Sequence, residues 1–589
     1  MAQAGARERA KQKTFGGQAS VRPMVKRILC VLILLCAVIV SLRTTWIVSG
    51  TLFDSDTSSE LILGEKLARE GGIMSASWAY STELQVIDCQ IIYALLFRVC
   101  GSWFLVRFWG AVIMQAMMLG AFGFMARQAR IPFNRFCIAA AAMLMPFSVA
   151  YGRIVLYHNY YAFHLIMANL TVGCYLGAVR RAGQEGAWKR WPLWVFAGCL
   201  GLISFAAGLE GVRQMMVCTA PLLASALLAA MCGEKGETPE EQNRLRKSWP
   251  GLALAAGSFA CSGLGYLVNL SAFAGKYSYT DYSGQYVTLR GADQLEAIIR
   301  SFLSTLGFHD QTSLFTLHGI LGIVSVLIWV AAALLAFHTL GHTKDGAARF
   351  LSIFMLMTHV VMVFVFMLLA LEDYQIDLYF LPVSFWIIPM LAKADLRPDS
   401  GVPETEGKKG IAALVWGGDA KLSVHGLIAL AVLGMYLANG IYYTGFFRDP
   451  KTYGRDIEYS GLRYTDTENV AAMRPIADYL KENGYTLIYA SYWDAAVITE
   501  LTDGQVKSVP VEVGRRKHPI QYYDWLTDLS LRNPAWAAEQ KAGVLANFDL
   551  SASLGEGNQY GATANSDYGA YTLYDLPQPA ALAEDLWKE

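Results

Sequence analysis

Eleven apolar runs of about twenty residues constrain this chain more than any other feature of its sequence, because a membrane-spanning helix needs about 20 mostly apolar residues. Hydrophobic residues make up 54% of the 589 residues and charged residues only 16%, whereas soluble proteins carry about 25% charged residues. We therefore predict an α-helical polytopic membrane protein with about 11 transmembrane helices. The runs lie near residues 28–48, 103–126, 134–152, 160–179, 191–209, 213–232, 249–270, 316–338, 350–371, 376–392 and 423–445.

Basic residues set the predicted orientation of these helices, since Lys and Arg are enriched in cytoplasmic connections. Residues 1–27 form a basic N-terminal segment ahead of an apolar run that we interpret as an uncleaved first membrane helix. With this segment in the cytoplasm, every inner connection carries Lys or Arg, for example Arg127, Arg180, Lys247, Lys344 and Lys408. We expect a multi-pass protein of the plasma or inner membrane, with a cytoplasmic N-terminus and an extracytoplasmic C-terminus.

Two long loops and the C-terminal tail are then predicted on the outer side. Outer loop one, residues 49–102, contains a stretch of helical periodicity from Ser58 to Glu70 and a short apolar stretch from Val86 to Val99. The second stretch is too short to span and contains Asp88 and Arg98, so we expect a helix lying at the membrane interface. A second outer loop covers residues 271–315, and its later part, DQLEAIIRSFLSTLGF, is predicted to be helical.

The tail, residues 446–589, follows the predicted transmembrane domain of residues 28–445. It alternates helical patterns (NVAAMRPIADYLKENG, DAAVITELTDG) with strand patterns (TLIYAS, QVKSVPVEV, AGVLANFDL, GAYTLYDL). Alternation of this size indicates a small extracytoplasmic α/β domain. Within it, Trp493 and Asp494 could contact a sugar, although packing of the aromatic ring in the domain core is the favoured interpretation.

Carboxylates follow the outer end of the first membrane helix in the sequence FDSDTSSE. Asp54 and Asp56 have two interpretations: a helix cap supplied by Asp56 or Ser58, or a base next to the membrane that takes a proton from an acceptor hydroxyl. Glu83, later in the same loop, is either a second functional carboxylate or a residue of a helical first turn, where a negative charge is favourable.

Cationic and further polar groups are also predicted near outer helix ends. Arg153 and His158 could contact a lipid phosphate, or Arg153 could extend its charge to the interface and His158 lie at the surface. Glu210 and Arg213 flank a tight turn as an ion pair or as site residues. His309, Tyr374 and Asp377 are further candidates; all seven positions are read from the sequence.

Several functions are not supported. The formal net charge is zero, so no global basic field would attract nucleic acid. We find no GxxxxGK[ST], GxGxxG after a strand or HExxH motif. A substrate that carries its own leaving group, such as an activated lipid, fits better than cytoplasmic ATP.

The first half of the chain resembles membrane glycosyltransferases of the type C fold (GT-C), which use lipid-linked sugars. The resemblance rests on FDSDTSSELILGEKLAREGG, QIIYALLFRVCGSWFLVRFWGAV, MPFSVAYGRIVLYHNYYAFHL and YFLP at Tyr379–Pro382. Uncharacterised bacterial members of this group are similar over FDSD, WAYSTEL and the tail stretch YASYWDAAVITELTDG. Two departures stand out: Ser55 separates the acidic pair, and the His-Pro-Pro usual before the interfacial helix is replaced by Ile87, Asp88 and Cys89.

The resemblance implies inverting transfer of a hexosyl or pentosyl group from a polyprenyl-phosphate sugar to an unknown extracytoplasmic acceptor hydroxyl in the cell envelope, on a glycan, lipid or protein. Asp56, or else Asp54, would be the base, with Glu83 as a further catalytic candidate. Arg153, His158 or Arg213 would bind the donor phosphate. Some members bind a divalent cation through the acidic motif, so Asp54 and Asp56 would hold Mg or Mn if the enzyme is metal-dependent.

Two alternatives remain at this point. A transporter or lipid flippase would place ionisable groups near the bilayer midplane, and the sequence offers little sign of this. A non-catalytic membrane scaffold with an outer binding domain would tolerate Asn at both Asp54 and Asp56.

Overall fold

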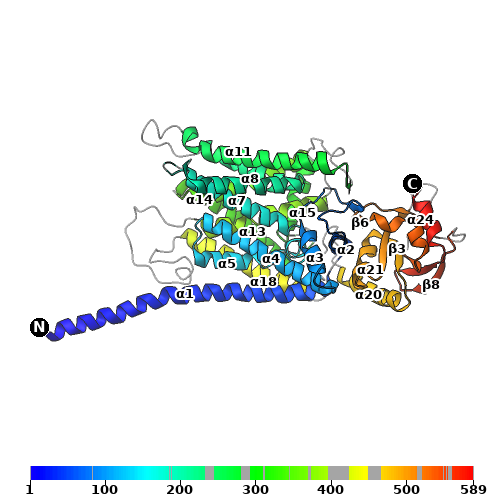
Figure 1. Cartoon of the computed structure of the whole chain (residues 1–589). Helices are drawn as coiled ribbons and strands as arrows, with labels where there is room; N and C mark the ends of the chain where they lie inside the picture. Colours follow the sequence, from blue (N-terminus) through cyan, green and yellow to red (C-terminus); the bar gives the residue numbers. More distant parts are fainter. Residues whose placement is uncertain are drawn as a thin grey trace.

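The computed structural model describes the chain except residues 1, 53, 83, 185, 187–188, 232–243, 280–291, 309–311, 344, 369–372, 395–423, 449–465, 514–519, 548–549, 552–553, 555–559 and 588–589. A bundle of long helices fills one part of the molecule, and a smaller domain of strands and helices caps one end of that bundle (Figure 1). The small domain is the C-terminal domain, here residues 466–587.

The bundle confirms a helical multi-pass membrane protein. Seven helices in the described part of the chain are long and apolar enough to cross a membrane, and each predicted apolar run contains helix. The long helices are α1 (Ala2–Thr51, crossing from Met24), α4 (Trp103–Gln128), α7 (Ala162–Ala182), α8 (Trp191–Leu209), α11 (Arg244–Val268, continued by η4, Asn269–Phe273), α13 (Leu317–His342) and α14 (Gly346–Leu368). Shorter ones are α5 (Phe133–Met143), η3 with α9 (Met215–Thr219, Ala220–Met231), and α15 with α16 (Asp373–Ser384, Ile387–Lys393), while α18 (Val424–Arg448) occupies the last predicted run.

The predicted continuous span at 134–152 is wrong. Helix α5 ends at Met143, and Pro146 follows it, where a missing N–H and a fixed φ oppose a continuous helix. Ser148 then caps a new short helix, α6 (Val149–Tyr151), by accepting a hydrogen bond from the Tyr151 N–H at 3.2 Å. The chain continues as a π-helical segment, η1 (Gly152–Tyr157), a conformation often found at functional sites.

Outer loop one forms α2 (Ser55–Glu70), β1 (Trp78–Tyr80) and α3 (Cys89–Phe97), so both predicted helices of the loop are confirmed. The buried ring of Tyr93 on α3 lies between two glycines. A Cβ on Gly64 of α2 would lie 2.5 Å from the Tyr93 Cβ, and a Cβ on Gly110 of α4 would lie 2.3 Å from the ring. Any larger residue would displace this ring, so the two glycines allow α3 to fix α2 against the bundle.

The C-terminal domain confirms the predicted α/β pattern. Its six-stranded sheet has the order β5-β4-β3-β7-β9-β8, with β3 parallel to β4 and β7 and antiparallel pairs at both edges. Branched and aromatic side chains such as Tyr489, Val509 and Val544 are fully buried in its core. The strands are β3 (Leu487–Ser491), β4 (Lys507–Val513), β5 (Ile520–Tyr522), β7 (Ala542–Ala546), β8 (Thr563–Asp567) and β9 (Thr572–Leu576); the helices are α20 (Asp466–Glu482), α21 (Tyr492–Leu501), α22 (Pro534–Ala538) and α24 (Pro579–Trp587).

A second, three-stranded sheet joins the two parts of the molecule. Its order is β2-β1-β6, with β2 (Ser278–Tyr279) from the second outer loop, β1 from outer loop one and β6 (Thr527–Asp528) from the C-terminal domain. The predicted helix of the second loop is also present, as α12 (Ala292–Thr305). Three segments far apart in sequence therefore meet at the end of the bundle beside α2 (Figure 1).

Candidate active site

The first turn of α2 lies where the bundle meets the C-terminal domain, and Asp54 caps it. The Asp54 carboxylate accepts the Thr57 backbone N–H at 3.0 Å, and the Thr57 hydroxyl oxygen accepts the Asp54 N–H at 3.1 Å. This reciprocal pair satisfies donors that a helix start leaves without partners. A cap was predicted here, but on Asp56 or Ser58; the capping residue is Asp54, which leaves Asp56 inside the first turn.

Asp54 is also paired with the guanidinium of Arg153, whose side chain is almost fully buried. Burial alone would raise the pKa of the Asp54 carboxyl, but the charge of Arg153 and the capping hydrogen bond hold it below its usual range. Both carboxylate oxygens are therefore engaged, one by the Thr57 cap and the other by Arg153. Such a carboxylate is fully ionised but has little remaining basicity.

The donor set at this position does not fit the predicted divalent-cation site. Asp54 already neutralises a guanidinium, and a metal ion would have to displace that cation. Within the described residues, no three His, Cys, Asp or Glu side chains come together in a way that could hold a metal ion.

Asp56 has a different environment. It is partly exposed and accepts a hydrogen bond from the hydroxyl of Tyr492, the first residue of α21, and another from the side chain of Trp525. Burial and the neighbouring charge of Asp54 raise the pKa of Asp56 to about 6. A carboxylate with this pKa is ionised at neutral pH yet basic enough to accept a proton.

The broken helix after α5 positions Arg153 and His158. Both are buried, and the His158 Nε2 lies 2.6 Å from the carbonyl oxygen of Leu52 at the end of α1. Burial lowers the pKa of His158 to about 3, so the ring is neutral at physiological pH. A neutral His158 ring carries no positive charge, so the positive charge beside Asp54 comes from Arg153.

Glu210 and Arg213 flank the predicted turn, where Gly211 has the left-handed φ of 91°. Glu210 accepts the backbone N–H of Ile87 ahead of α3. Arg213 donates to the hydroxyls of Tyr161 and Thr82 at 3.2 and 2.9 Å. These contacts tie the α8 end to outer loop one.

Arg213 also lies over the ring of Tyr379, with its guanidinium carbon 5.1 Å from the ring centroid. Tyr379 begins the YFLP stretch that carried part of the family resemblance. A guanidinium against an aromatic face is held in place without losing its charge. A second cation therefore faces the same end of the bundle as Arg153.

Two further carboxylates, not predicted as site residues, are buried beside α2 and α3. Burial, together with the charges of Asp88 and Asp56, raises the pKa of Glu60 to about 8. Burial raises the pKa of Asp88, the cap of α3, to about 7. The Cys89 thiol lies 3.8 Å from the Glu60 carboxylate. The spacing of Glu60 four residues after Asp56 could have indicated that both share one helix face.

In the YWDAA motif the structure contradicts the expected core packing of Trp493, while sugar contact by Trp493 or Asp494 stays a prediction. Trp493, for which core packing was favoured, is 62% exposed. Asp494 is bound inside its own domain by Ser491 and Tyr571 at 2.5 and 3.0 Å. The residue that reaches the acidic motif is the preceding one, Tyr492, and no signal in the sequence alone connects it to a position 436 residues away.

Four other candidates cannot be placed. Glu83 and His309 lie outside the described residues, and Tyr374 and Asp377 belong to α15 in a part whose side chains are not described. Their roles stay predictions.

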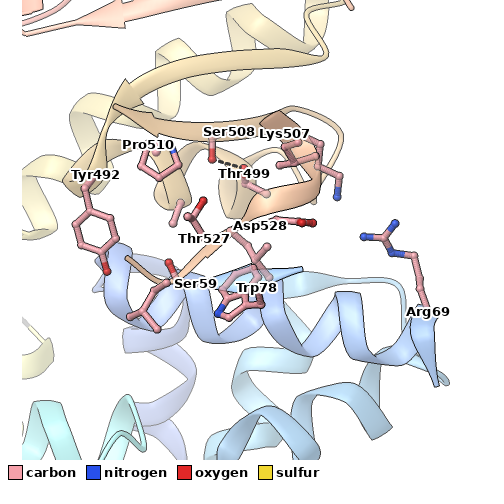
Figure 2. Close-up of a pocket in the computed structure, with 15 residues that line it drawn as sticks. Ser59, Arg69, Trp78, Tyr492, Thr499, Lys507, Ser508, Pro510, Thr527 and Asp528 are labelled. Atoms are coloured by element: carbon pink, nitrogen blue, oxygen red, sulfur yellow. Dashed lines mark hydrogen bonds between the residues drawn. The ribbon is translucent and has the colours of Figure 1, made fainter. Parts of the chain in front are cut away.

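A small pocket lies beside these groups, between α2 and the C-terminal domain (Figure 2). Ser59 and Trp78 form its floor, and the hydrogen-bonded pair Thr499 and Ser508 lies opposite. Tyr492 borders one end, while Lys507 and Arg69 border the other. The Tyr492 side chain thus borders this pocket and also contacts Asp56.

No protein-family model matches the chain, and no curated protein matches it. Among solved structures, the chain is similar to the crystal structure of ArnT from Cupriavidus metallidurans bound to undecaprenyl phosphate, with a TM-score of 0.48 and 12% sequence identity. The match covers 92% of this chain and 97% of ArnT. At this identity it identifies no individual site residue.

Proposed function

We propose that the protein is an inverting membrane glycosyltransferase that moves a sugar from a polyprenyl-phosphate donor to an extracytoplasmic hydroxyl of a cell-envelope acceptor. The observation that carries this proposal is the state of Asp56: a partly exposed carboxylate at the end of the bundle, with a pKa raised to about 6. A carboxylate whose pKa is raised by burial and by a neighbouring like charge is a functional-site candidate.

In the proposed reaction the acceptor oxygen attacks the anomeric carbon of the donor sugar. The bond between that carbon and the phosphate oxygen breaks, and polyprenyl phosphate leaves with the electron pair. Asp56 receives the proton of the attacking hydroxyl. Arg153 and Arg213 are the cations that would stabilise charge on the departing phosphate.

The two aspartates suit different roles. Asp54 caps α2 and neutralises Arg153, and its low pKa makes it a weak base. Asp56 is free of the cap role and retains basicity. We infer that Asp56 is the base and that Asp54 orients both α2 and Arg153.

The proposal also requires the site to face outward. Under the orientation inferred from the basic connections, the C-terminal domain and the N-terminus of α2 lie outside the cytoplasm. A lipid-linked donor would then reach the site from the outer leaflet. Its polyprenyl chain would lie among apolar helix surfaces and leave only the phosphate and the sugar at the polar end of the bundle.

The test is sugar transfer by the purified full-length protein in lipid bilayers supplied with radiolabelled polyprenyl-phosphate sugars and candidate acceptor extracts. We expect Asp56→Asn to abolish transfer while the protein still folds and binds the lipid donor. Asp478→Asn is a matched control, since Asp478 is an exposed aspartate of α20. Unaltered transfer by Asp56→Asn would disprove the assignment of the base, and donor translocation without transfer would favour a flippase.

A further inference from the structure

Helix α21 of the C-terminal domain brings a phenol to the acidic motif of the membrane part. Tyr492 is its first residue and is 7% exposed. The Tyr492 hydroxyl donates to Asp56 Oδ1, and Trp525 of the same domain also donates to this carboxylate. Both of these donors to Asp56 therefore come from the C-terminal domain, more than 430 residues further along the chain.

Contacts at both ends of α21 fix its position on α2. At the start, the Ser55 hydroxyl donates to the carbonyl oxygen of Tyr492 itself. Near the end, Glu500 accepts the Ser58 hydroxyl at 2.7 Å and the Arg107 Nε at 2.6 Å, with a second bond from Arg107 Nη2. The side chains of Arg107 and Glu500 are 1% and 5% exposed. A bidentate pair at this depth fixes orientation as well as distance.

Packing restricts the ring as well. The Tyr492 ring lies 5.2 Å from the rings of both Tyr523 and Trp493, measured between centroids. With its backbone bound by Ser55 and its ring packed against neighbours, the phenol has little freedom to leave the carboxylate. A catalytic group gains most when neighbouring groups hold it in one geometry before substrate binds.

We propose that Tyr492 is a positioning residue for Asp56, so that the C-terminal domain completes the active site rather than merely covering it. This inference rests on the proposed function of Asp56 as base. A carboxylate has about four acceptor positions on its two oxygens, so the two donors still leave capacity for the acceptor hydroxyl. The donors from Tyr492 and Trp525 determine which face of the Asp56 carboxylate the substrate meets. Tyr492 itself transfers no proton.

The hydrogen bond has a measurable consequence, because a donor to a carboxylate favours its ionised form. Removing the hydroxyl makes Asp56 easier to protonate. We expect Tyr492→Phe to move the acid limb of the kcat/KM profile to higher pH by about one unit, the order expected for a hydrogen bond to a charged group. We also expect kcat to fall about tenfold at neutral pH while the KM for the donor changes less than about threefold.

Tyr489→Phe is the matched control. Tyr489 lies on β3 of the same domain, is fully buried, and its hydroxyl has no hydrogen-bond partner among the described residues. This variant also deletes one buried phenolic oxygen but should leave both the pH profile and kcat unchanged. If Tyr492→Phe is folded and its profile coincides with that of Tyr489→Phe, the positioning role is refuted.

A second measurement separates this inference from the proposed function. Infrared difference spectra across a pH titration report the carboxyl band that Asp56→Asn removes, and they require no sugar transfer. If the wild type transfers no sugar but Tyr492→Phe raises the midpoint of that band, the Tyr492–Asp56 coupling holds and only the proposed function fails. An unmoved band in a folded variant overturns the coupling.

If Tyr492→Phe does not fold, 3-fluorotyrosine at position 492 keeps the ring and its hydroxyl. Fluorine makes the phenol a stronger donor, so the band midpoint and the acid limb should move to lower pH. No movement with this replacement would overturn the proposal as well.

Discussion

Breaking the buried ion pair between Arg107 and Glu500 should release the C-terminal domain from the bundle. The pair joins α4 to α21 through two hydrogen bonds, and the side chains are 1% and 5% exposed. In Arg107→Met, the buried Glu500 carboxylate loses both hydrogen bonds from Arg107 and keeps the one from the Ser58 hydroxyl. Removing one partner of a buried pair costs about 3–5 kcal/mol, which corresponds to a factor of about 10² to 10⁴ in an equilibrium constant.

Hydrogen exchange can measure this loss at the joint itself. The backbone N–H of Leu529 donates to the carbonyl oxygen of Ser77 at 2.8 Å, across the boundary between the C-terminal domain and outer loop one. Exchange of this amide through undocking follows the opening equilibrium. In lipid nanodiscs, Arg107→Met should accelerate exchange in peptides covering residues 527–529 by at least about a hundredfold.

Two comparisons decide whether the reasoning is correct. The double variant Arg107→Met with Glu500→Leu removes both charges and should recover most of the protection, since apolar replacement of a whole buried pair is often neutral. Arg300→Met breaks an exposed pair in which the Arg300 and Glu296 side chains are 51% and 74% exposed. This variant should change exchange little. Exchange in Arg107→Met within about threefold of wild type would show that the pair does not hold the domains together.

Four further results are expected. Because the pKa of Asp56 is raised to about 6, the base is protonated below that pH, so kcat/KM should fall about tenfold per pH unit there; an acid limb near pH 4 would contradict this. At pH 7, Asp54→Ala should lower the thermal stability more than Asp54→Asn does. Both variants remove the carboxylate from Arg153, but Asn can still cap the helix, and such a cap contributes about 1 kcal/mol. The carboxylate of Asp54 has a depressed pKa, so its stabilising effect should be present above pH 4 and disappear at lower pH, and the difference between wild type and Asp54→Asn should shrink on acidification. Gly64→Ala should destabilise the packing of α2 on α3 by about 1–3 kcal/mol, measured by thermal unfolding in detergent, because its Cβ would lie 2.5 Å from the Tyr93 Cβ.

Local sequence patterns were sufficient to predict most elements of the fold. Apolar length located the helices of the bundle, since lipid requires every backbone group in a span to be satisfied within it. Alternation of helical and strand periods located β3, α21, β4 and β7 in the tail. The break at Pro146 was missed because a count of apolar residues does not register a lost backbone donor.

The acidic motif shows what only the tertiary structure decides. The sequence placed Asp54 and Asp56 at the start of a helix and suggested Asp56 or Ser58 as the cap. Which one caps depends on φ and ψ at a single residue, and Asp54 has the extended backbone that a cap requires. The sequence therefore could not say which carboxylate stays available as a base.

The pairing of Asp54 with Arg153 and of Asp56 with Tyr492 is likewise a property of the assembled molecule. The partners are 99 and 436 residues apart, and no local pattern relates them. They meet because α3 fixes α2 to the bundle through Tyr93, while α21 is bound to α2 by Ser55 and Glu500. Residue types and helix lengths follow from the sequence, but the opposite shifts of two neighbouring aspartates arise only when burial and long-range partners are in place.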